Sequence, residues 1–276
     1  MAGNASGNAE YNIYGAHMSQ SILVQREGPV ATVVLNRPER LNALDLASWR
    51  RLGEVAIELD RQDDLRCIVI RGAGEKAFAA GADISAFARE RADVKQARLY
   101  GETVHESLTA VSTCRHPTLA MIRGVCVGGG LELACCCDLR IAGDTSRFGV
   151  PIKQLGLTMT HGELKALIDL VGKAGALEIL LEGAIFGAER ALRLGLVTRV
   201  VPDAELDREV AETVARIAAG APLVARWHKK FIRRLLDPAP LSAEEVEEGF
   251  AAMGTEDYRR GVAAFLAKRK PEFTGS

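Results

Sequence analysis

The chain has 276 residues, a formal net charge of −1 and 48% hydrophobic residues, enough for one large domain or a domain with an appendage. A charge so close to zero argues against nucleic acid or an anionic membrane as the main partner. No apolar run approaches the roughly 20 residues that a membrane-spanning helix needs. Residues 1–20 lack the basic stretch and apolar core of a secretory signal, so we expect a flexible tail and a cytoplasmic protein.

The six cysteines indicate a reduced interior. Three of them, Cys135, Cys136 and Cys137, are consecutive, which excludes an orderly disulfide framework, and no Cys-x-x-Cys pair occurs. The five histidines show no ligand spacing among themselves or with the cysteines. We therefore expect buried thiols and no metal site.

The first half of the chain alternates predicted strands and helices, as is typical of an α/β protein. Its apolar patterning predicts strands at 21–26 and 30–36, a helix at 44–60, a strand at 67–70, a helix at 94–111 and a strand at 118–122. The first two strands are expected to form a hairpin. The apolar run 67–70 favours a strand covered on both faces, and the strand, helix, strand order favours a right-handed crossover.

The second half begins with short strands and ends in helices. Strands are predicted at 138–142, 147–150 and 197–201, and helices at 162–171, 174–181, 188–194, 206–219, 222–236, 243–253 and 255–268. Asp203 and Thr255 are expected to be N-caps. We expect an α/β core at 21–202 and a helical region at 203–276.

Two loops rich in small residues, 72–83 and 124–130, each follow a predicted strand. Glycine lets the backbone turn sharply and lets another group come close, and the first N–H groups of a helix have no internal partner. The second loop therefore suits an oxyanion, with Glu132 one turn inside the helix as an acid or base. The alternatives are a plain mobile loop at 72–83 and a tight strand-to-helix turn with a solvated glutamate at 124–132.

Five segments in order resemble the enoyl-CoA hydratase/isomerase (crotonase) family. They are residues 35–44, 77–84, 124–138, 148–151 and 256–271. Each is a weak signal alone, but the five in order make a strong one, and the resemblance covers about residues 21–271.

The resemblance implies a spiral of β-α-β units followed by helices that build a trimer or a dimer of trimers. It also implies an acyl-CoA thioester as the substrate, with coenzyme A as part of that substrate and no other cofactor. The thioester carbonyl would lie between the backbone N–H groups of Ala82 and Gly129, and Glu132 would be the acid or base.

The same resemblance suggests where the substrate contacts lie. The positions are Arg37, Arg40, Ala43, Ala80, Asp83, Ile84, Gly128, Pro151, Phe265 and Lys268. Arginines suit the phosphates of coenzyme A. Exposed turn arginines, a loop-bracing Asp83 and ordinary helix packing of Phe265 and Lys268 are the structural alternatives.

The chain departs from the family at its second acidic position, where the hydratases carry glutamate after proline and this chain carries Ile152. Isoleucine cannot transfer a proton. The glycine-rich turn that follows in the family is replaced by 159–163, which brings in His161 and Glu163. Either one is a candidate for the missing acid, and a surface histidine and a first-turn helix glutamate are the alternatives.

Several activities fit this pattern. Glu132 alone suits an isomerase that shuttles one proton, whereas hydration needs both an activated water and a proton for Cα. A thioester hydrolase or decarboxylase using the same N–H groups is an alternative, and so is an acyl-CoA-binding protein that has lost hydratase activity.

Overall fold

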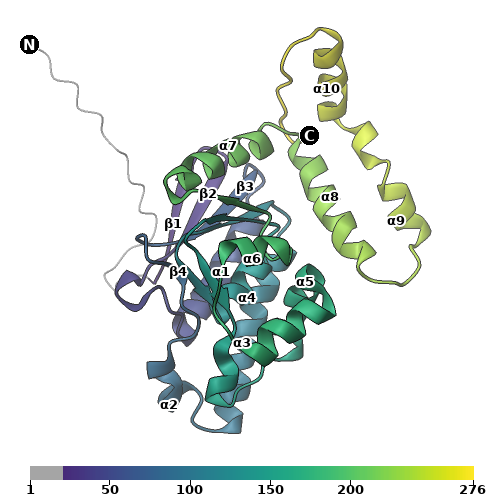
Figure 1. Cartoon of the computed structure of the whole chain (residues 1–276). Helices are drawn as coiled ribbons and strands as arrows, with labels where there is room; N and C mark the ends of the chain where they lie inside the picture. Colours follow the sequence, from purple (N-terminus) through teal and green to yellow (C-terminus); the bar gives the residue numbers. More distant parts are fainter. Residues whose placement is uncertain (1–20) are drawn as a thin grey trace, which may run out of the picture.

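Two sheets built by a repeating strand pattern form the body of the molecule (Figure 1). The computed structural model describes residues 21–276, and the tail expected at 1–20 lies outside the described residues. The larger sheet has the order β1-β2-β3-β5-β7-β10, and the smaller one the order β4-β6-β8-β9.

The larger sheet is parallel except at one edge. Its strands are β1 (Ile22–Glu27), β2 (Val30–Leu35), β3 (Cys67–Gly72), β5 (Thr118–Ile122), β7 (Leu139–Gly143) and β10 (Arg199–Val201). β1 and β2 pair antiparallel with Ile22 opposite Leu35, which confirms the predicted hairpin. The other pairs are parallel.

The smaller sheet lies partly in segments that the sequence analysis treated as loops. Its strands are β4 (Ala77–Ala79), β6 (Val125–Val127), β8 (Arg147–Gly149) and β9 (Phe186–Gly187). The loop assignment was wrong for β4 and β6, because strands of three residues are too short to show a period. Their ladder bonds come from each other and from β8.

The strand order makes the chain spiral. β3 is followed by β4, β5 by β6 and β7 by β8, and each step adds a neighbour to both sheets. The parallel pairs β4–β6 and β6–β8 therefore mirror β3–β5 and β5–β7. The expected spiral of β-α-β units is confirmed.

Helices cover both faces of the larger sheet. On one face lie α1 (Leu46–Asp60) and α3 (Val94–Thr113), which are N-capped by Asp45 and Asp93. α7 (Leu206–Ala218) covers the other face. Alternate residues of β3 reach the two layers: Ile68 faces α1, whereas Val69 lies in the cluster under α7.

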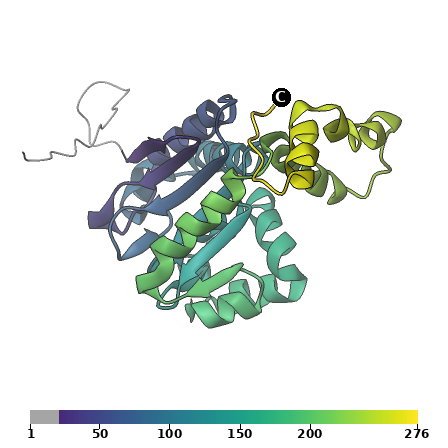
Figure 2. The ribbon, with the colours of Figure 1, turned by 90° about the horizontal axis from the view of Figure 1, so that it is seen from above.

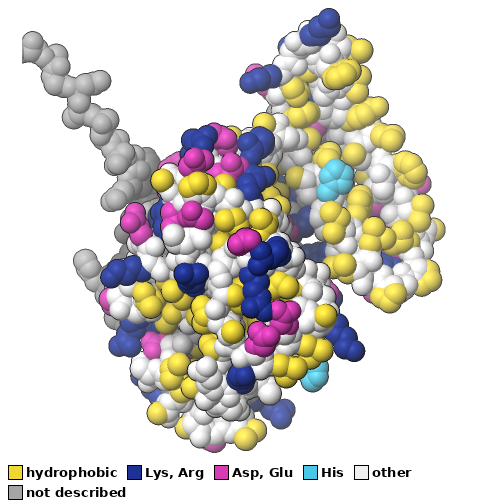
Figure 3. Space-filling view, in the orientation of Figure 1, with side chains coloured by type: hydrophobic (Ala, Val, Ile, Leu, Met, Phe, Trp, Pro, Cys, Tyr) yellow, Lys and Arg dark blue, Asp and Glu magenta, His cyan; other side chains and the backbone are white. Residues whose placement is uncertain are grey.

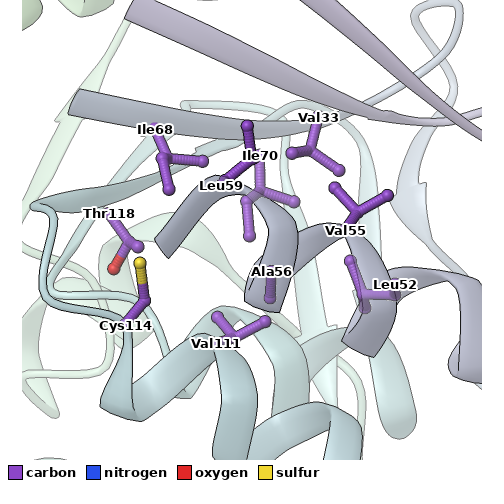
Figure 4. A pocket seen from close by; sticks show the side chains of 10 residues that line it. All are labelled: Val33, Leu52, Val55, Ala56, Leu59, Ile68, Ile70, Val111, Cys114 and Thr118. Atoms are coloured by element: carbon purple, nitrogen blue, oxygen red, sulfur yellow. The ribbon is translucent and has the colours of Figure 1, made fainter. Parts of the chain in front are cut away.

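The layer between α1 and the sheet is closely packed (Figure 4). Side chains including Val33, Leu52, Val111 and Cys114 surround a cavity of about 10 Å³. This is roughly the space of one water, so this cavity is not a ligand site.

Of the remaining helices of the core, α2 (Phe87–Glu90) was not predicted, and two predicted helices are joined in α5 (His161–Glu182). α2, α4 (Gly129–Cys135) and α6 (Ala188–Arg193) are short. α5 runs through the two predicted helices at 162–171 and 174–181, with a break at Gly172, where φ is 68°.

The last three helices, α8 (Pro222–Leu235), α9 (Ala243–Glu248) and α10 (Glu256–Leu266), stand apart from the sheets (Figures 1 and 2). α8 is tied to the core by its cations: Lys229 Nζ lies 2.7 Å from Asp138 Oδ2, and Arg233 donates to the carbonyl oxygen of Thr113 over 3.0 Å.

Two local expectations in this region were wrong. The predicted helix at 243–253 ends at Glu248, before the poor helix former Gly249, and a separate 3-10 turn follows at Ala251–Gly254. Asp203 does not cap α7, because it begins a 3-10 turn and its carboxylate accepts a hydrogen bond from Thr145. Thr255 caps α10 as predicted, accepting from Tyr258 N over 3.0 Å.

Candidate active site

The parallel pairing of β4 and β6 brings the two small-residue loops together. Residues at the carboxyl ends of neighbouring parallel strands meet at one edge of a sheet. A Cβ built on Gly81 would lie 3.2 Å from the nitrogen of Gly129, and one built on Gly129 would lie 3.7 Å from the nitrogen of Ala82. Ala82 and Gly129, the two positions expected to share an oxygen, are therefore adjacent.

Glycines permit this approach at specific points. Gly81 has φ of 92° and Gly128 has φ of 51°, conformations that favour glycine. A Cβ on Gly130 would lie 2.3 Å from the carbonyl oxygen of Ala79, so only glycine lets α4 start directly against β4.

The two N–H groups differ from their neighbours in their hydrogen bonding. Gly129 is the first residue of α4, where an N–H has no acceptor within the helix. The neighbouring N–H of Gly128 is used, donating to Gly149 over 2.9 Å. Within residues 21–276, neither Ala82 N nor Gly129 N donates to a loop or turn carbonyl.

The first loop is braced by an ion pair. Arg37 donates to Asp83 Oδ2 over 2.8 Å and to the carbonyl oxygen of Ala43 over 2.7 Å. Asp83 also accepts from Ser85 Oγ, and hydrogen bonds from Ser85 and then the Arg37 guanidinium lower its pKa. Asp83 therefore braces the loop. The Arg37 guanidinium is occupied by hydrogen bonds that stabilise the segment carrying Ala82.

The other residues expected to contact the substrate near this loop differ in their exposure to solvent. Ala80 N donates to the carbonyl oxygen of Leu41 over 2.9 Å, whereas Ile84 is 58% exposed. The Arg40 side chain is half exposed and lies 3.7 Å from Asp83. It is the more accessible of the two arginines.

Glu132 is a buried carboxyl group on α4. Burial raises its pKa to about 8, the negative charge of Glu163 adds to the rise, and the positive charge of Arg91 opposes it. At pH 7 this carboxyl group is mostly protonated, and raising the pH by about one unit ionises half of it. A carboxyl poised in this way suits proton transfer.

Glu163, His161 and Ile152 occupy different environments around this group. Glu163 is half-buried at the start of α5 and closes a capping box with Thr160, yet its charge reaches Glu132. His161 is exposed. Ile152 lies in the 3-10 turn Pro151–Leu155 and packs against the core, so the family's acidic position is filled by a hydrocarbon.

Three residues near the site escaped the sequence analysis: Trp49, Arg91 and Tyr100. Trp49 Cζ2 would lie 3.0 Å from a Cβ on Gly129, and Trp49 Nε1 donates to the Tyr100 hydroxyl over 3.0 Å. The Arg91 guanidinium lies over the Tyr100 ring, 3.7 Å from its centroid. Helical periodicity marks Trp49 and Tyr100 only as core positions, so the sequence held no signal of their place at the site.

Phe265 and Lys268 are not brought to this site within the chain. Phe265 is 82% exposed on α10, and α10 lies far from α4 (Figure 1). Pro151 begins the 3-10 turn that carries Ile152.

A pocket larger than the cavity beneath α1 lies elsewhere. It has a volume of about 270 Å³ between α8 and the end of α3 and is lined by Arg115, Trp227, Lys229 and neighbouring cations. Among residues 21–276, no group of three or more His, Cys, Asp or Glu side chains is placed to hold a metal ion. No helix in the described part of the chain is long and apolar enough to cross a membrane.

A sequence profile described as enoyl-CoA hydratase/isomerase matches residues 25–276. The chain belongs to the enoyl-CoA hydratase/isomerase family. A relative from Mycobacterium tuberculosis, named probable enoyl-CoA hydratase, is 37% identical over 257 residues, covering 92% of this chain and 98% of the relative. The short-chain-enoyl-CoA hydratase of Clostridium acetobutylicum is 34% identical over 254 residues, covering 91% and 97%.

Solved structures of the family share the fold. A crystal structure of an enoyl-CoA hydratase/carnitine racemase from Magnetospirillum magneticum superposes with a TM-score of 0.91 at 50% identity, covering 93% of this chain and 96% of that chain. The crystal structure of enoyl-CoA hydratase from Bacillus anthracis gives a TM-score of 0.87 at 30% identity, covering 93% and 100%. The resemblance inferred from the five motifs is therefore confirmed.

Proposed function

We propose that this enzyme acts on an acyl-CoA thioester and stabilises its enolate between the N–H groups of Ala82 and Gly129. The carrying observation is that Ala82 and Gly129 lie next to each other, and that the helix beginning at Gly129 also carries the buried carboxyl of Glu132. Negative charge develops on the thioester oxygen when a proton leaves Cα or a nucleophile adds at Cβ. Fixed N–H donors aimed at that oxygen are each worth ~2.7–4 kcal/mol in other enzymes.

Glu132 is the acid or base in this proposal. Its pKa of about 8 allows both protonation states near neutral pH, which is the condition for efficient general catalysis. As a base it takes a proton from carbon or water, and as an acid it returns one to the enolate.

The requirement for a second acid distinguishes hydration from isomerisation. Ile152 supplies no proton, so a one-base isomerisation needs Glu132 alone, whereas hydration needs help from a second group. Glu163 is the carboxyl whose charge reaches Glu132, which makes it the candidate partner for hydration. Its capping bond to Thr160 N fixes its position at the start of α5.

The test is a turnover assay with crotonyl-CoA for hydration and a 3-enoyl-CoA for isomerisation, following the absorbance of the conjugated thioester. Glu132→Gln is expected to lower kcat about 10²–10⁴-fold, because the amide keeps the shape but transfers no proton. Glu163→Gln is expected to reduce hydration more than isomerisation.

Each alternative function has its own signature in the same assay. Release of free coenzyme A thiol indicates a hydrolase, and release of carbon dioxide from a carboxylated thioester indicates a decarboxylase. Thioester binding without turnover above the Glu132→Gln background indicates an acyl-CoA-binding protein and overturns the proposed catalysis.

A further inference from the structure

Arg91 is a cation with no carboxylate partner at the edge of the candidate site. It follows α2 directly, and its guanidinium lies 3.7 Å from the ring centroid of Tyr100 and 4.4 Å from that of Phe87. Its Nε is buried and has no hydrogen-bond partner. Among residues 21–276 no carboxylate lies within ion-pair distance of it, whereas nearby Arg89 pairs with Glu90 over 3.1 Å.

A chain of contacts links this cation to Gly129. Arg91 stacks on Tyr100, the Tyr100 hydroxyl accepts from Trp49, and the Trp49 ring borders Gly129. Its charge also acts on the buried carboxyl of Glu132. The positive charge is therefore connected to Gly129 through Tyr100 and Trp49, and it is near enough to act on Glu132.

The two aromatic rings fix the plane of the guanidinium but do not neutralise it. A stacked guanidinium keeps its edge N–H groups free, and these match a carboxylate in a two-point geometry. Because Glu132 holds its proton below pH 8, it does not repel an incoming anion at neutral pH.

We infer that Arg91 binds a carboxylate at the far end of the substrate's acyl group. The preferred substrates would then be coenzyme A thioesters of dicarboxylic acids. This inference rests on the proposed function, because it takes the space beside Glu132 as the acyl end of the substrate site. Arg91 is a specificity residue in this scheme and takes no part in proton transfer.

The test compares the dissociation constants of glutaryl-CoA and butyryl-CoA, measured by calorimetry. The two ligands differ only by the terminal carboxylate, so every contact with the coenzyme A part cancels in their ratio. The wild type is expected to bind glutaryl-CoA at least about tenfold more tightly, the effect of one charged hydrogen bond.

Variants assign the preference to Arg91. Arg91→Gln is expected to bring the ratio of the two constants to within about threefold of one. Arg91→Met, which keeps the apolar stem on the rings, gives the same result and replaces the first variant if that one does not fold. Arg89→Gln is the matched control, because Arg89 is exposed on α2 and already paired, and it is expected to keep the wild-type ratio.

A wild-type ratio near one overturns the inference, as does an Arg91 variant that weakens both ligands equally. Failure of the proposed function looks different, because both ligands are saturated and their binding requires no turnover. An enzyme that prefers glutaryl-CoA but converts no enoyl-CoA refutes only the proposed catalysis. A chain that binds neither ligand refutes both.

Discussion

Opposing effects of its surroundings set the pKa of Glu132. Burial and the charge of Glu163 favour the protonated form, and Arg91 favours the ionised form. The same residue was identified from its place one turn after the glycine loop, but its protonation behaviour depends on side chains from α5 and from the segment after α2. Sequence spacing locates such a group, whereas its neighbours decide its chemistry.

The raised pKa makes stability depend on pH. The folded state holds the Glu132 proton more tightly than the unfolded state, whose pKa is near 4.5. The stability this proton gives is fully present below pH 4.5 and is lost as the pH rises towards 8. From pH 5.5 to 8.5 we expect the wild type to lose on the order of 3 kcal/mol relative to Glu132→Gln.

Urea unfolding at both pH values measures this difference. Glu75→Gln, in an exposed loop position, is the control and is expected to follow the wild type at both. A constant difference between wild type and Glu132→Gln across this range would contradict the buried, protonated carboxyl.

At the scale of elements, the site depends on the smaller sheet. β4 and β6 lie side by side, so the residues after each strand meet. The loop after β4 is fixed by Arg37 and Asp83, and the loop after β6 is fixed by the start of α4. The two proposed donors are therefore held by separate parts of the fold.

Gly129→Ala tests this arrangement. The new methyl would lie 3.0 Å from Trp49 Cζ2 and 3.7 Å from Ala82 N, in the space between the two donors. We expect a loss of about 10²-fold in kcat/KM, similar to removal of one donor. The fold is expected to survive, because only the far edge of one ring must shift.

Gly101→Ala provides the matched control. Gly101 lies within α3 with open space around its Cβ position. Alanine there is expected to stabilise the helix by about 0.5–1 kcal/mol and to leave kcat/KM unchanged. Equal activity of the two alanine variants would rule out the shared-oxygen geometry.

At the scale of the whole molecule, α8–α10 carry an unusual amount of exposed apolar surface (Figure 3). Leu235, Phe250, Phe265 and Leu266 are 66%, 57%, 82% and 76% exposed. Apolar patches of this kind mark protein–protein contacts. We propose that they are covered by other copies of the chain, which would also give Phe265 and Lys268 a route to a neighbouring site.

Light scattering tests this proposal. The expected mass is three or six times 29.7 kDa. Leu235→Glu is expected to lower the mass, because a charge in an apolar contact is costly. Ile57→Glu, at an exposed apolar position on α1, is the control and is expected to keep the oligomer. A wild-type monomer would contradict the proposal.

The sequence by itself determined the order of the longer strands and helices and the place of Glu132 one turn after a glycine loop, because apolar periodicity and glycine positions act locally. The spiral and the pairing of Ala82 with Gly129 were implied by the resemblance of five ordered motifs to the family. Long helices such as α1 and α3 were predicted within two residues at each end. The presence of Ile152 at the family's second acidic position was visible only through that resemblance.

Only the tertiary structure decided which groups from distant segments act on Glu132 or border Gly129. Glu163, Arg91, Tyr100 and Trp49 come from four separate segments, and no spacing in the chain relates them. The strands β4 and β6 were also invisible, because three residues carry no period and gain their hydrogen bonds from each other. The electrostatics of the site are set by contacts between distant segments, so they exist only once the chain is folded.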